Sequence, residues 1–421
     1  MAKLRILLLT NRDSDNIGDQ IIEASAIALI RAAMLNLDIP DFSISSRAAG
    51  MVTRKYMETR DPVHLESARK SIAEADVIVF GGAPLFNYAY QSFYLRTIIT
   101  LELAQEYGVP VLFSSIGVEP FDFENSKSLA LRDALHLPCV RQITTRDDFR
   151  SLDAYVEGTN IPIAHVADPA VFADIVFDQV ADAGAASDSR PVVGLVATRA
   201  GIFADNGIDF SEDDQRHFWL ECIDLLTSRG YDYRIFTTGH FTDEVFLDSL
   251  MRESSVDPKK VGIPINSPEE LIRELRQCSG LIAYRLHASI TAFAFDIPSI
   301  GLSWNFKVPY FYQSVNYPER ALEPERWNAD EAVSALEQAM ADGVKKDPQF
   351  LMTVYETLFA GLQDIFDPDS EEVPFTYSEL RERLPRYSGT TERQYREKIS
   401  RKLRRTYENY QKLRRAAAAA R

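Results

Sequence analysis

The chain has 421 residues, of which 46% are apolar and 26% are charged, and its formal net charge is −16. This length and composition predict two or three domains with a substantial core, and the acidic balance argues against nucleic acid as a partner. No apolar run approaches the roughly 18–20 residues of a membrane-spanning helix, and three scattered cysteines without a CxxC spacing indicate neither a disulfide scaffold nor a zinc site, which favours a cytoplasmic protein.

The first part of the chain alternates apolar, strand-like runs with helix-like segments. Strands are expected over 4–9, 77–80, 111–115, 140–144 and 163–166, and long helices over 20–37 and 91–107. The first of these helices is apolar nearly all round, so it should be buried. Strands that alternate with helices are typical of a parallel sheet with helical crossovers. We therefore expect a doubly wound α/β domain over residues 1–180.

A small, polar stretch over 181–190, with the sequence ADAGAASDSR, is typical of a linker. The alternation then starts again, with expected strands over 192–197, 233–237, 281–284 and 299–303 and expected helices over 213–228, 268–278 and 288–295. This pattern predicts a second doubly wound α/β domain over 191–328, followed by a helical extension over 329–421.

Polar or glycine-rich segments follow the expected strands of the first domain, at the edge of the sheet where open α/β proteins bind ligands. Asn16-Ile17-Gly18-Asp19 precedes a helix whose free N–H groups favour an anion, although Asp19 could simply cap that helix. The other segments of this kind are Gly81-Gly82, Ser115-Ile116-Gly117, Arg146-Asp147 and Asp168-Pro169-Ala170.

Two of these segments leave an alternative open. Arg146 either points into the crevice or forms a surface pair with Asp147 that contributes little to stability. Asp168 either lines the cleft or only makes a turn. In the second domain, His240 follows a strand end and is a candidate for contact with a ligand.

Arg285-Leu286-His287 is the most informative segment, because an apolar strand runs into a helix at this point. A guanidinium is a planar fork that suits carboxylate or phosphate, and an imidazole can move a proton near neutral pH. The segment therefore indicates chemistry on a small anion. The alternative is that Arg285 forms a salt bridge across a domain and that His287 caps the helix.

The end of the chain is basic. Residues 381–421 contain 14 Lys and Arg against 4 Asp and Glu, a net +10, so the remainder of the chain carries −26. An apolar stripe recurs there every three or four residues, formed by Tyr395, Ile399, Leu403, Tyr407, Tyr410 and Leu413. Such a helix can lie on an anionic membrane surface, which we predict for residues 390–421. The alternative is that the stripe packs on the acidic body.

Taken in chain order, these motifs resemble those of the polysaccharide pyruvyl transferase family over about residues 5–310. The matching segments are Asn16-x-Gly18-Asp19, Gly81-Gly82-x-x-Leu85-Phe86, Ser115-Ile116-Gly117, Arg146-Asp147-x-x-x-Ser151, Asp168-Pro169-Ala170, Arg285-Leu286-His287-Ala288, Pro298 and Lys307. The resemblance implies a GT-B-like α/β fold, in which two Rossmann-like domains face a cleft. It also implies an enzyme that transfers the enolpyruvyl group of phosphoenolpyruvate to two hydroxyls of a sugar in a cell-surface polysaccharide or its precursor. The product is a cyclic pyruvate ketal, phosphate is released, and neither a cofactor nor a metal is required.

The resemblance also implies a role for each candidate residue in catalysis or in binding. His287 serves as general acid or base, with Asp19 or Asp168 as the second proton acceptor. The donor-binding candidates are Arg285, Arg146, Leu286, Lys307 and Arg199. The candidates for acceptor binding or for lining the cleft are Asn16, Gly18, Gly81, Gly82, Ser115, Gly117 and His240.

Two other functions remain open from the sequence. One is a GT-B-type glycosyltransferase that uses a nucleotide sugar, because a crevice Arg and His would also suit a diphosphate. The other is a non-catalytic scaffold that organises a glycan assembly complex through its basic tail. If the chain is the transferase, the tail would hold it at the inner face of the membrane, near lipid-linked sugar acceptors.

Overall fold

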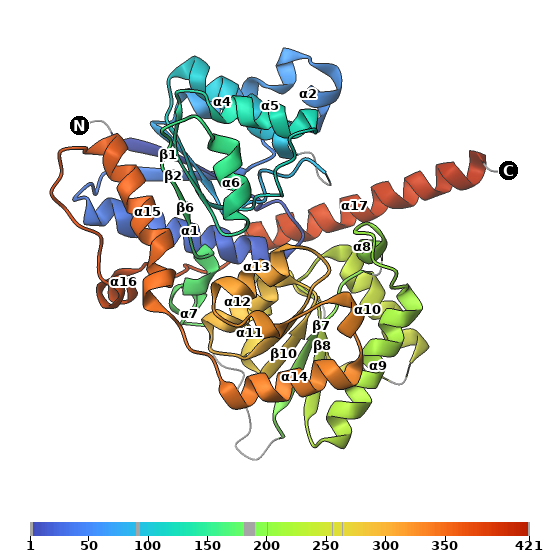
Figure 1. Ribbon diagram of the computed structural model, residues 1–421. Helices are drawn as coiled ribbons and strands as arrows, with labels where there is room; N and C mark the ends of the chain where they lie inside the picture. The colour runs from blue at the N-terminus through green and yellow to red at the C-terminus, as the bar shows by residue number, and fades with distance from the viewer. Residues whose placement is uncertain are drawn as a thin grey trace.

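The computed structural model describes residues 3–89, 93–180, 190–199, 201–254, 256–262 and 264–419. The expected linker over 181–190 lies almost entirely outside the described residues. Two α/β domains are stacked on each other, and a long C-terminal helix projects from the body (Figure 1). Each domain has a six-stranded sheet, and all strand pairings in the described chain are parallel. The predicted two-domain α/β architecture is therefore confirmed.

The first sheet has the order β2-β1-β3-β4-β5-β6. Its strands are β1 (Leu4–Thr10), β2 (Phe42–Ala48), β3 (Val77–Gly81), β4 (Val111–Ile116), β5 (Val140–Thr145) and β6 (Ile163–His165). The helices of this domain are α1 (Ile17–Asn36), α2 (Arg54–Thr59), α3 (Glu66–Ala73), α4 (Phe93–Tyr107), α5 (Ser126–Leu135), α6 (Phe149–Val156) and α7 (Ala173–Val176). Strand β2 was not predicted, because it is an edge strand of sequence FSISSRA whose residues are only partly buried or exposed. A strand of this kind needs no apolar run to pair.

The second sheet has the order β12-β11-β10-β7-β8-β9. Its strands are β7 (Val192–Val196), β8 (Asp232–Phe236), β9 (Val261–Gly262), β10 (Gly280–Ala283), β11 (Ser299–Leu302) and β12 (Ala321–Leu322). Its helices are α8 (Gly201–Ala204), α9 (Glu212–Ser228), α10 (Phe241–Glu253), α11 (Pro268–Arg276), α12 (Leu286–Ala294) and α13 (Lys307–Ser314). The sequence did not predict β9 and β12, which have two residues each, or helix α10.

Short 3-10 turns that begin with proline connect several of these elements, since a proline at the first position already has the required φ and needs no hydrogen bond there. They are η1 (Pro62–His64), η2 (Pro169–Phe172), η3 (Pro258–Lys260), η4 (Pro318–Arg320) and η5 (Pro324–Arg326).

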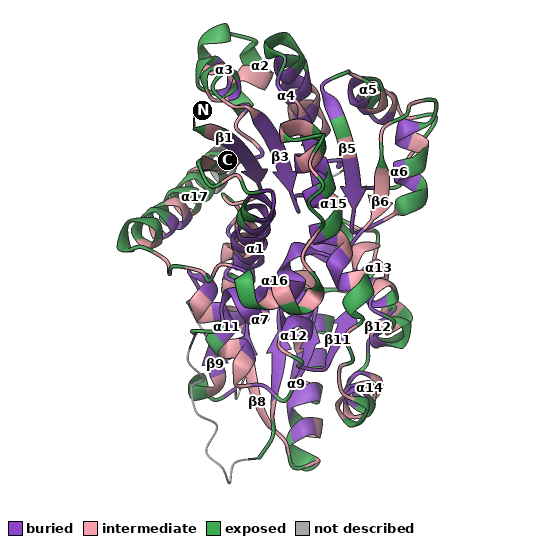
Figure 2. Ribbon diagram, turned by 90° about the vertical axis from the view of Figure 1, so that its left-hand side faces the viewer, coloured by how far each residue is buried: buried purple, intermediate pink, exposed green. Residues whose placement is uncertain are grey.

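Helix α1 joins the cores of the two domains. It packs on β1 and β3 of its own sheet and also on α11 and α12 of the second domain. Its side chains and those of α12 belong to one continuous apolar cluster. Figure 2 shows the buried interior of both sheets and of α1 in purple. The helix is buried as expected, and it holds the two walls of the interdomain cleft together.

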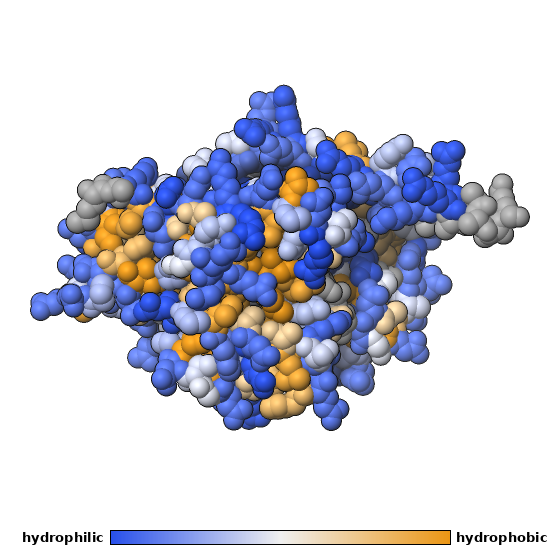
Figure 3. All heavy atoms as spheres, turned by 90° about the horizontal axis from the view of Figure 1, so that it is seen from above, coloured by the Kyte–Doolittle hydropathy of each residue, from blue (hydrophilic) through white to orange (hydrophobic). Residues whose placement is uncertain are grey.

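The chain after residue 329 is helical, as expected, but its first helices are not separate from the two domains. Helix α14 (Ala329–Asp342) packs on α9, β10 and β11 of the second domain. Helix α15 (Pro348–Phe366) crosses back and packs on α1, β4 and β5 of the first. Helices α16 (Tyr377–Arg383) and α17 (Glu392–Ala419) follow. The end of the molecule formed by the first domain is largely hydrophilic, with apolar groups between the polar ones (Figure 3).

Candidate active site

A cleft of about 540 Å³ lies between the carboxyl ends of the two sheets, within the usual size of ligand sites. It is lined from the first domain by Asn11, Ser14, Asn16, Asp19, Pro84, Asn87, Ala89, Glu119 and Arg146, and from the second by Arg199, Ile202, Asp205, Asn206, His240, Arg285, Leu286, His287, Trp304, Asn305, Phe306 and Lys307. The cleft thus brings together most of the predicted site residues. Those that stand behind its wall are Gly18, Gly81, Gly82, Ser115, Gly117 and Asp168.

His287 lies at the centre, on the first turn of α12, with 14% of its side chain exposed. Its Nδ1 is 3.1 Å from the side-chain nitrogen of Asn16 and 3.9 Å from a carboxylate oxygen of Asp19. The imidazole packs on Gly18, where an added Cβ would lie 2.2 Å from the His287 Cβ. The cap residue of α12 is Arg285, so the alternative that His287 caps this helix is wrong.

The electrostatic surroundings keep His287 uncharged. Burial lowers the pKa of His287 well below its ordinary value, and Arg146, Lys307 and Arg285 lower it further. Burial also raises the pKa of Asp19, although a hydrogen bond with Ser14 opposes this shift. The imidazole is therefore neutral at pH 7 before a ligand binds.

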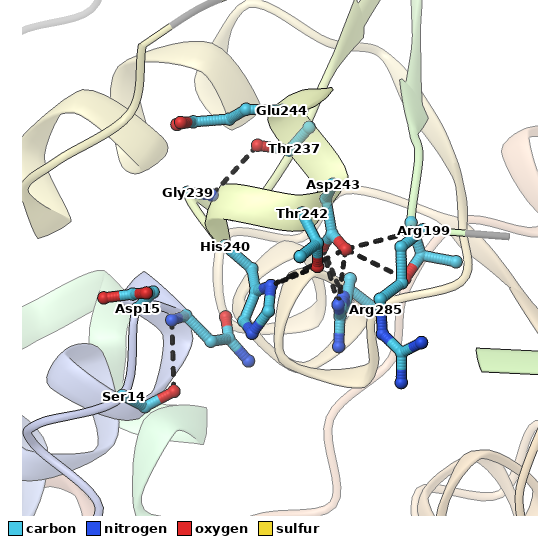
Figure 4. Close-up of polar contacts among 12 residues, drawn as sticks. Ser14, Asp15, Arg199, Thr237, Gly239, His240, Thr242, Asp243, Glu244 and Arg285 are labelled. Atoms are coloured by element: carbon cyan, nitrogen blue, oxygen red, sulfur yellow. Dashed lines mark hydrogen bonds and ion pairs between the residues drawn. The ribbon is translucent and has the colours of Figure 1, made fainter. Parts of the chain in front are cut away.

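Arg285 is held by a carboxylate of its own domain. Its Nε and Nη2 donate to the two oxygens of Asp243 at 2.8 and 2.7 Å, and Asp243 is fully buried in the first turn of α10 (Figure 4). The same carboxylate accepts the backbone N–H of Arg199 at 2.9 Å. Arg285 therefore does form the salt bridge that the alternative interpretation expected, within its own domain. A guanidinium has five donors, so this arrangement leaves donors for a ligand.

Arg146 enters the cleft from the loop after β5 and is 6% exposed. Its guanidinium forms an ion pair with Asp168, and neighbouring Asp147 is buried as well, so the surface-pair alternative is wrong. Asp168 also accepts the N–H of Ala170 at 2.8 Å and so caps η2. Because its carboxylate faces Arg146 behind the wall, we no longer expect Asp168 to exchange a proton with a ligand.

Lys307 completes a group of three cations, with Arg146 and Arg285, that surround His287. It stands at the start of α13 and is partly buried. Burial lowers the pKa of Lys307, and Asp147 opposes this effect. The three side chains come from different segments of both domains, so only the folded chain forms this positive centre. Arg146 and Arg285 are each paired with a carboxylate, so it is their remaining N–H donors and the ammonium of Lys307 that suit a small anion.

Glycine residues behind the wall allow the loops after the strands of the first domain to pack closely. Gly82 has a φ of 60°, and an added Cβ there would lie 2.3 Å from Ile22. At Gly117 a Cβ would lie 2.9 Å from Pro84 and 3.1 Å from a carboxylate oxygen of Asp147. At Gly81 the neighbours would be Leu8 and Ala26. These glycines therefore shape the wall of the cleft, and a contact between them and a ligand stays a prediction.

Ser115 has a similar supporting role. It is fully buried with a φ of 54°, and its hydroxyl donates to the carbonyl oxygen of Ala167 at 2.9 Å. Its backbone N–H donates to the hydroxyl of Thr144 at 2.8 Å. Ser115 thus ties the ends of β4 and β5 to the segment that carries Asp168.

The cleft continues along the second domain. His240 stands at the N-terminus of α10 with its Nδ1 2.9 Å from the hydroxyl of Thr242, and burial together with Arg285 lowers the pKa of His240 to about 4. Arg199 pairs with Asp205 at 2.5 Å near the cleft mouth. Trp304 donates its ring N–H to the carbonyl of Tyr284 at 2.6 Å. Polar groups therefore also line this part of the cleft.

Several functional candidates were missed in the sequence. Asp243 lies three residues after His240, on a helix that the sequence did not predict. Glu119 accepts the backbone N–H groups of Tyr88 and Ala89 at 2.9 and 3.1 Å, and so holds a wall of the cleft. The position of Glu119 two residues after Gly117, at a strand end, is the signal that could have identified it.

The basic helix α17 holds a loop of the cleft. The buried Lys398 donates to the carbonyl oxygen of Ser14 at 2.8 Å, and Arg405 pairs with Asp15 at 2.8 Å. On the second domain, Lys402 pairs with Glu244 at 2.8 Å. Burial lowers the pKa of Lys398 to about 7, partly offset by Asp15. Basic side chains, not the apolar stripe, therefore make these contacts with the body.

The stripe itself is largely open to solvent. Leu403, Tyr407 and Tyr410 are 65%, 63% and 58% exposed. Tyr395 reaches an acidic partner, because its hydroxyl donates to Glu270 at 3.1 Å. The alternative that the stripe packs on the acidic body is wrong for Leu403, Tyr407 and Tyr410, while the side chain of Leu413 lies outside the described residues.

Within the part of the chain that the structure describes, no group of three or more His, Cys, Asp or Glu side chains is placed to hold a metal ion. That the reaction needs no metal stays a prediction. Over the same residues, none of the helices combines the length and the apolar character that a membrane span requires.

Comparison with known proteins identifies the family and the fold of the chain. A family model described as polysaccharide pyruvyl transferase matches residues 16–305, and no curated protein matches the chain in sequence. Similar solved structures include a protein provisionally described as UDP-N-acetylglucosamine 2-epimerase from Listeria monocytogenes, with 9% identity, a TM-score of 0.57 and coverage of 89% of this chain and 100% of that one. Another is UDP-GlcNAc 2-epimerase from Neisseria meningitidis bound to UDP-GlcNAc, with 9% identity, a TM-score of 0.53 and coverage of 86% and 99%.

A third is UDP-GlcNAc 2-epimerase from Methanocaldococcus jannaschii in complex with UDP-GlcNAc and UDP, with 14% identity, a TM-score of 0.51 and coverage of 86% and 99%. At such low identity these structures show the fold alone, which is GT-B-like with two Rossmann-like domains.

Proposed function

Because the chain belongs to the polysaccharide pyruvyl transferase family, we propose that it transfers the enolpyruvyl group of phosphoenolpyruvate to two hydroxyls of a sugar. The product is a cyclic pyruvate ketal on a cell-surface polysaccharide, such as a capsule or exopolysaccharide, or on its precursor. The observation that carries this proposal is the convergence of Arg146, Arg285 and Lys307 around a neutral His287 in one cleft.

The donor fits this arrangement by charge. Phosphoenolpyruvate carries a phosphate and a carboxylate, and three cations line the cleft beside His287. Arg285 is oriented by its two bonds to Asp243, and Arg146 is oriented by Asp168, so both guanidinium groups are preorganised. Arg199 stands further toward the mouth and suits a more distant anionic group. Leu286 lines the cleft between Arg285, a donor-binding residue, and His287, the proton-transfer residue.

The chemistry balances without a redox partner. One sugar hydroxyl adds to C2 of the donor while C3 gains a proton, and the second hydroxyl then displaces phosphate from the same carbon. One of the two hydroxyl protons ends up on C3, which becomes the methyl group of the ketal, and the other leaves with phosphate. Donor binding places negative charge beside His287, which offsets Arg146, Lys307 and Arg285 and raises the pKa of the imidazole. His287 then acts as general acid, and Asp19 is the second proton acceptor.

The acceptor is proposed to lie in the outer part of the cleft, between Asn16 and His240. His240 stands at the N-terminus of the 13-residue helix α10, where backbone N–H groups favour negative charge. A sugar linked to a nucleotide or to a lipid through phosphate would suit this position. No metal or cofactor is part of the proposal.

A glycosyltransferase that uses a nucleotide sugar is the second candidate. The observation in its favour is that Arg199 and Arg285 both line a cleft large enough for a nucleoside diphosphate. A non-catalytic scaffold is a third, and ketal formation by the wild type that is lost in a His287 variant would rule it out.

Calorimetry separates the first two candidates. We expect phosphoenolpyruvate to bind the wild type, and Arg285→Ala to weaken its binding at least ~30-fold, because truncating one partner of a hydrogen-bonded charge pair costs ~2 kcal/mol or more. Arg69→Ala is the matched control, since Arg69 lies on the surface and its side-chain partners among the described residues are Glu106 and Tyr107. UDP- and CMP-sugars are the comparison ligands. Binding of a nucleotide sugar alone, with no phosphate release from phosphoenolpyruvate, would instead support the glycosyltransferase.

We further propose that α17 holds the enzyme on the cytoplasmic face of an anionic membrane, near lipid-linked acceptors. Its exposed Leu403, Tyr407 and Tyr410 lie on a helix that also carries Lys412 and Arg415. Aromatic side chains with polar tips are favoured at the lipid–water boundary, and basic side chains are attracted to anionic headgroups. The helix extends away from the acidic body (Figure 1), so the repulsion between body and membrane is reduced.

Vesicle co-sedimentation tests the membrane proposal. Wild type should pellet with vesicles that contain anionic phosphatidylglycerol and stay in the supernatant with vesicles of neutral phosphatidylcholine. The triple variant Leu403→Ser, Tyr407→Ser, Tyr410→Ser should stay in the supernatant with both. Tyr107→Ser, which alters an exposed tyrosine of α4, is the matched control and should pellet normally. The triple variant is preferable to deletion of the tail, because deletion also removes Lys398 from Ser14. Equal recovery of wild type with both vesicle types would end the membrane proposal.

A further inference from the structure

The side chain of Asn16 has its orientation set by a backbone group. Its Oδ1 accepts the N–H of Gly18 at 3.2 Å, and its Nδ2 lies 3.1 Å from Nδ1 of His287. Gly18 is in the first turn of α1, where backbone N–H groups have no partner within the helix. A backbone N–H can only donate, so the oxygen of the amide must face Gly18 and the nitrogen must face His287.

From this contact we infer that Asn16 holds His287 as the tautomer that carries its proton on Nε2. The amide nitrogen of Asn16 can only donate, so Nδ1 of His287 must accept. A neutral imidazole has one N–H group, which is then on Nε2. The Cβ, Cγ and Nδ1 atoms of His287 are turned toward Gly18, so Nε2 lies at the far end of the ring, away from α1.

Asp19 does not compete for this contact in the resting site. Its carboxylate oxygen is 3.9 Å from Nδ1, beyond hydrogen-bond distance, and it instead accepts from the side chain of Asn11 at 3.2 Å. The other charged groups that face His287 are Arg146, Lys307 and Arg285. All three cations oppose protonation, and Asn16 opposes it as well, because an Nδ1–H would point at another donor.

The consequence deepens the proposed function and rests on it. The donor anion meets an Nε2–H that can donate a hydrogen bond, whereas the opposite tautomer would present a lone pair to an anion. For proton transfer to the donor, Nδ1 must first gain a proton and part from the Asn16 amide, and Nε2 then gives up its own proton. Asn16 is thus a positioning residue that acts through His287, in place of the acceptor-binding role that the sequence suggested for it.

Nitrogen-15 NMR of the full chain, labelled at histidine and free of ligand, tests this inference. In the wild type we expect the His287 signals of a protonated Nε2 and an unprotonated Nδ1, identified by their absence in His287→Gln. In Asn16→Asp a carboxylate accepts from both Gly18 and Nδ1, so the proton should move to Nδ1. This variant should also protonate at a pH about one unit higher or more, because a nearby opposite charge stabilises the imidazolium.

Asn125→Asp is the charge-matched control. The Oδ1 atom of Asn125 accepts the N–H of Lys127 at the start of α5, a bond that aspartate keeps, and Asn125 does not line the cleft, so this variant should leave the nitrogen pattern of His287 in the wild-type form. If Asn16→Asp does not fold, Asn16→Ala serves instead, and it should give a mixture of both tautomers. A wild type with its proton on Nδ1, or a pattern that neither Asn16 variant changes, would overturn the inference.

The two proposals fail separately. The NMR measurement uses ligand-free protein and needs no turnover, whereas ketal formation from phosphoenolpyruvate is followed by phosphate release. An Nε2–H tautomer in a protein that makes no ketal would contradict the proposed reaction and leave the role of Asn16 intact. Ketal formation by a protein with the Nδ1–H tautomer would contradict the role of Asn16 alone.

Discussion

His287→Asn is expected to lower kcat for ketal formation by roughly 10²–10⁴-fold, the usual contribution of a positioned general acid or base. Asparagine keeps a polar side chain of similar reach but cannot move a proton. The packing on Gly18 is retained, since the smaller side chain fits where the imidazole lay. The binding of phosphoenolpyruvate should change much less than kcat, because Arg285 and Arg146 remain.

The measurement is phosphate release with phosphoenolpyruvate and a sugar acceptor, combined with calorimetry for donor binding. His217→Asn is the matched control, because His217 is exposed on α9 and contacts only the carbonyl oxygen of Asp213 among the described residues. A variant at residue 287 with wild-type kcat would exclude His287 as the proton-transfer group. Loss of donor binding together with kcat would make it a binding residue instead.

Arg146→Met is expected to destabilise the fold by about 3–5 kcal/mol, the usual cost of removing one partner of a buried ion pair. The side chains of Arg146 and Asp168 are 5% and 2% exposed, so the change leaves a carboxylate buried without its cation. Asp168 retains only its bond to the N–H of Ala170 among the contacts described. Urea-induced unfolding, followed by circular dichroism, measures the change in the free energy of unfolding.

A double-mutant cycle with Asp168→Asn isolates the interaction energy between Arg146 and Asp168. The double variant should recover part of the lost stability, because the buried negative charge is then absent as well. Arg54→Met is the matched control, since the Arg54–Glu58 pair is exposed and should contribute no more than about 0.5 kcal/mol. Equal losses for Arg146→Met and Arg54→Met would show that the buried pair does not stabilise the fold.

The sites at strand ends were predictable for a general reason. Parallel strands with helical crossovers all end at the same edge of the sheet, so Asp19, Arg146 and Arg285 could be expected near a crevice before any contact was known. The strands themselves were recognisable because buried parallel strands are apolar on both faces. Strands β3 and β4 follow this rule, since all their residues are apolar apart from Gly81, Ser114 and Ser115. The half-polar edge strand β2 lacks this signal and was missed.

Partners far apart in the chain could not be read from local patterns. Asp243 orients Arg285 from a helix whose sequence, FTDEVFLDSLMRE, has no feature that marks the aspartate as buried. Lys398 lies in a basic, amphipathic segment that the sequence associated with a membrane, yet it is buried against Ser14. Its burial depends on the carbonyl oxygen of Ser14 and the carboxylate of Asp15, which are more than 380 residues away in the chain.

The sequence by itself determined the alternation of strands and helices, the fold class and most of the residues that line the cleft, because periodicity and strand ends are local properties. Only the tertiary structure decided which of those residues meet. Asn16 and His287 are 271 residues apart, and their contact exists because α1 packs on the first sheet and also on α11 and α12 of the second domain. The structure likewise placed Asp168 behind Arg146, and left Leu403, Tyr407 and Tyr410 in solvent. Burial, ion pairing and orientation depend on neighbours from other segments, which a linear pattern does not specify.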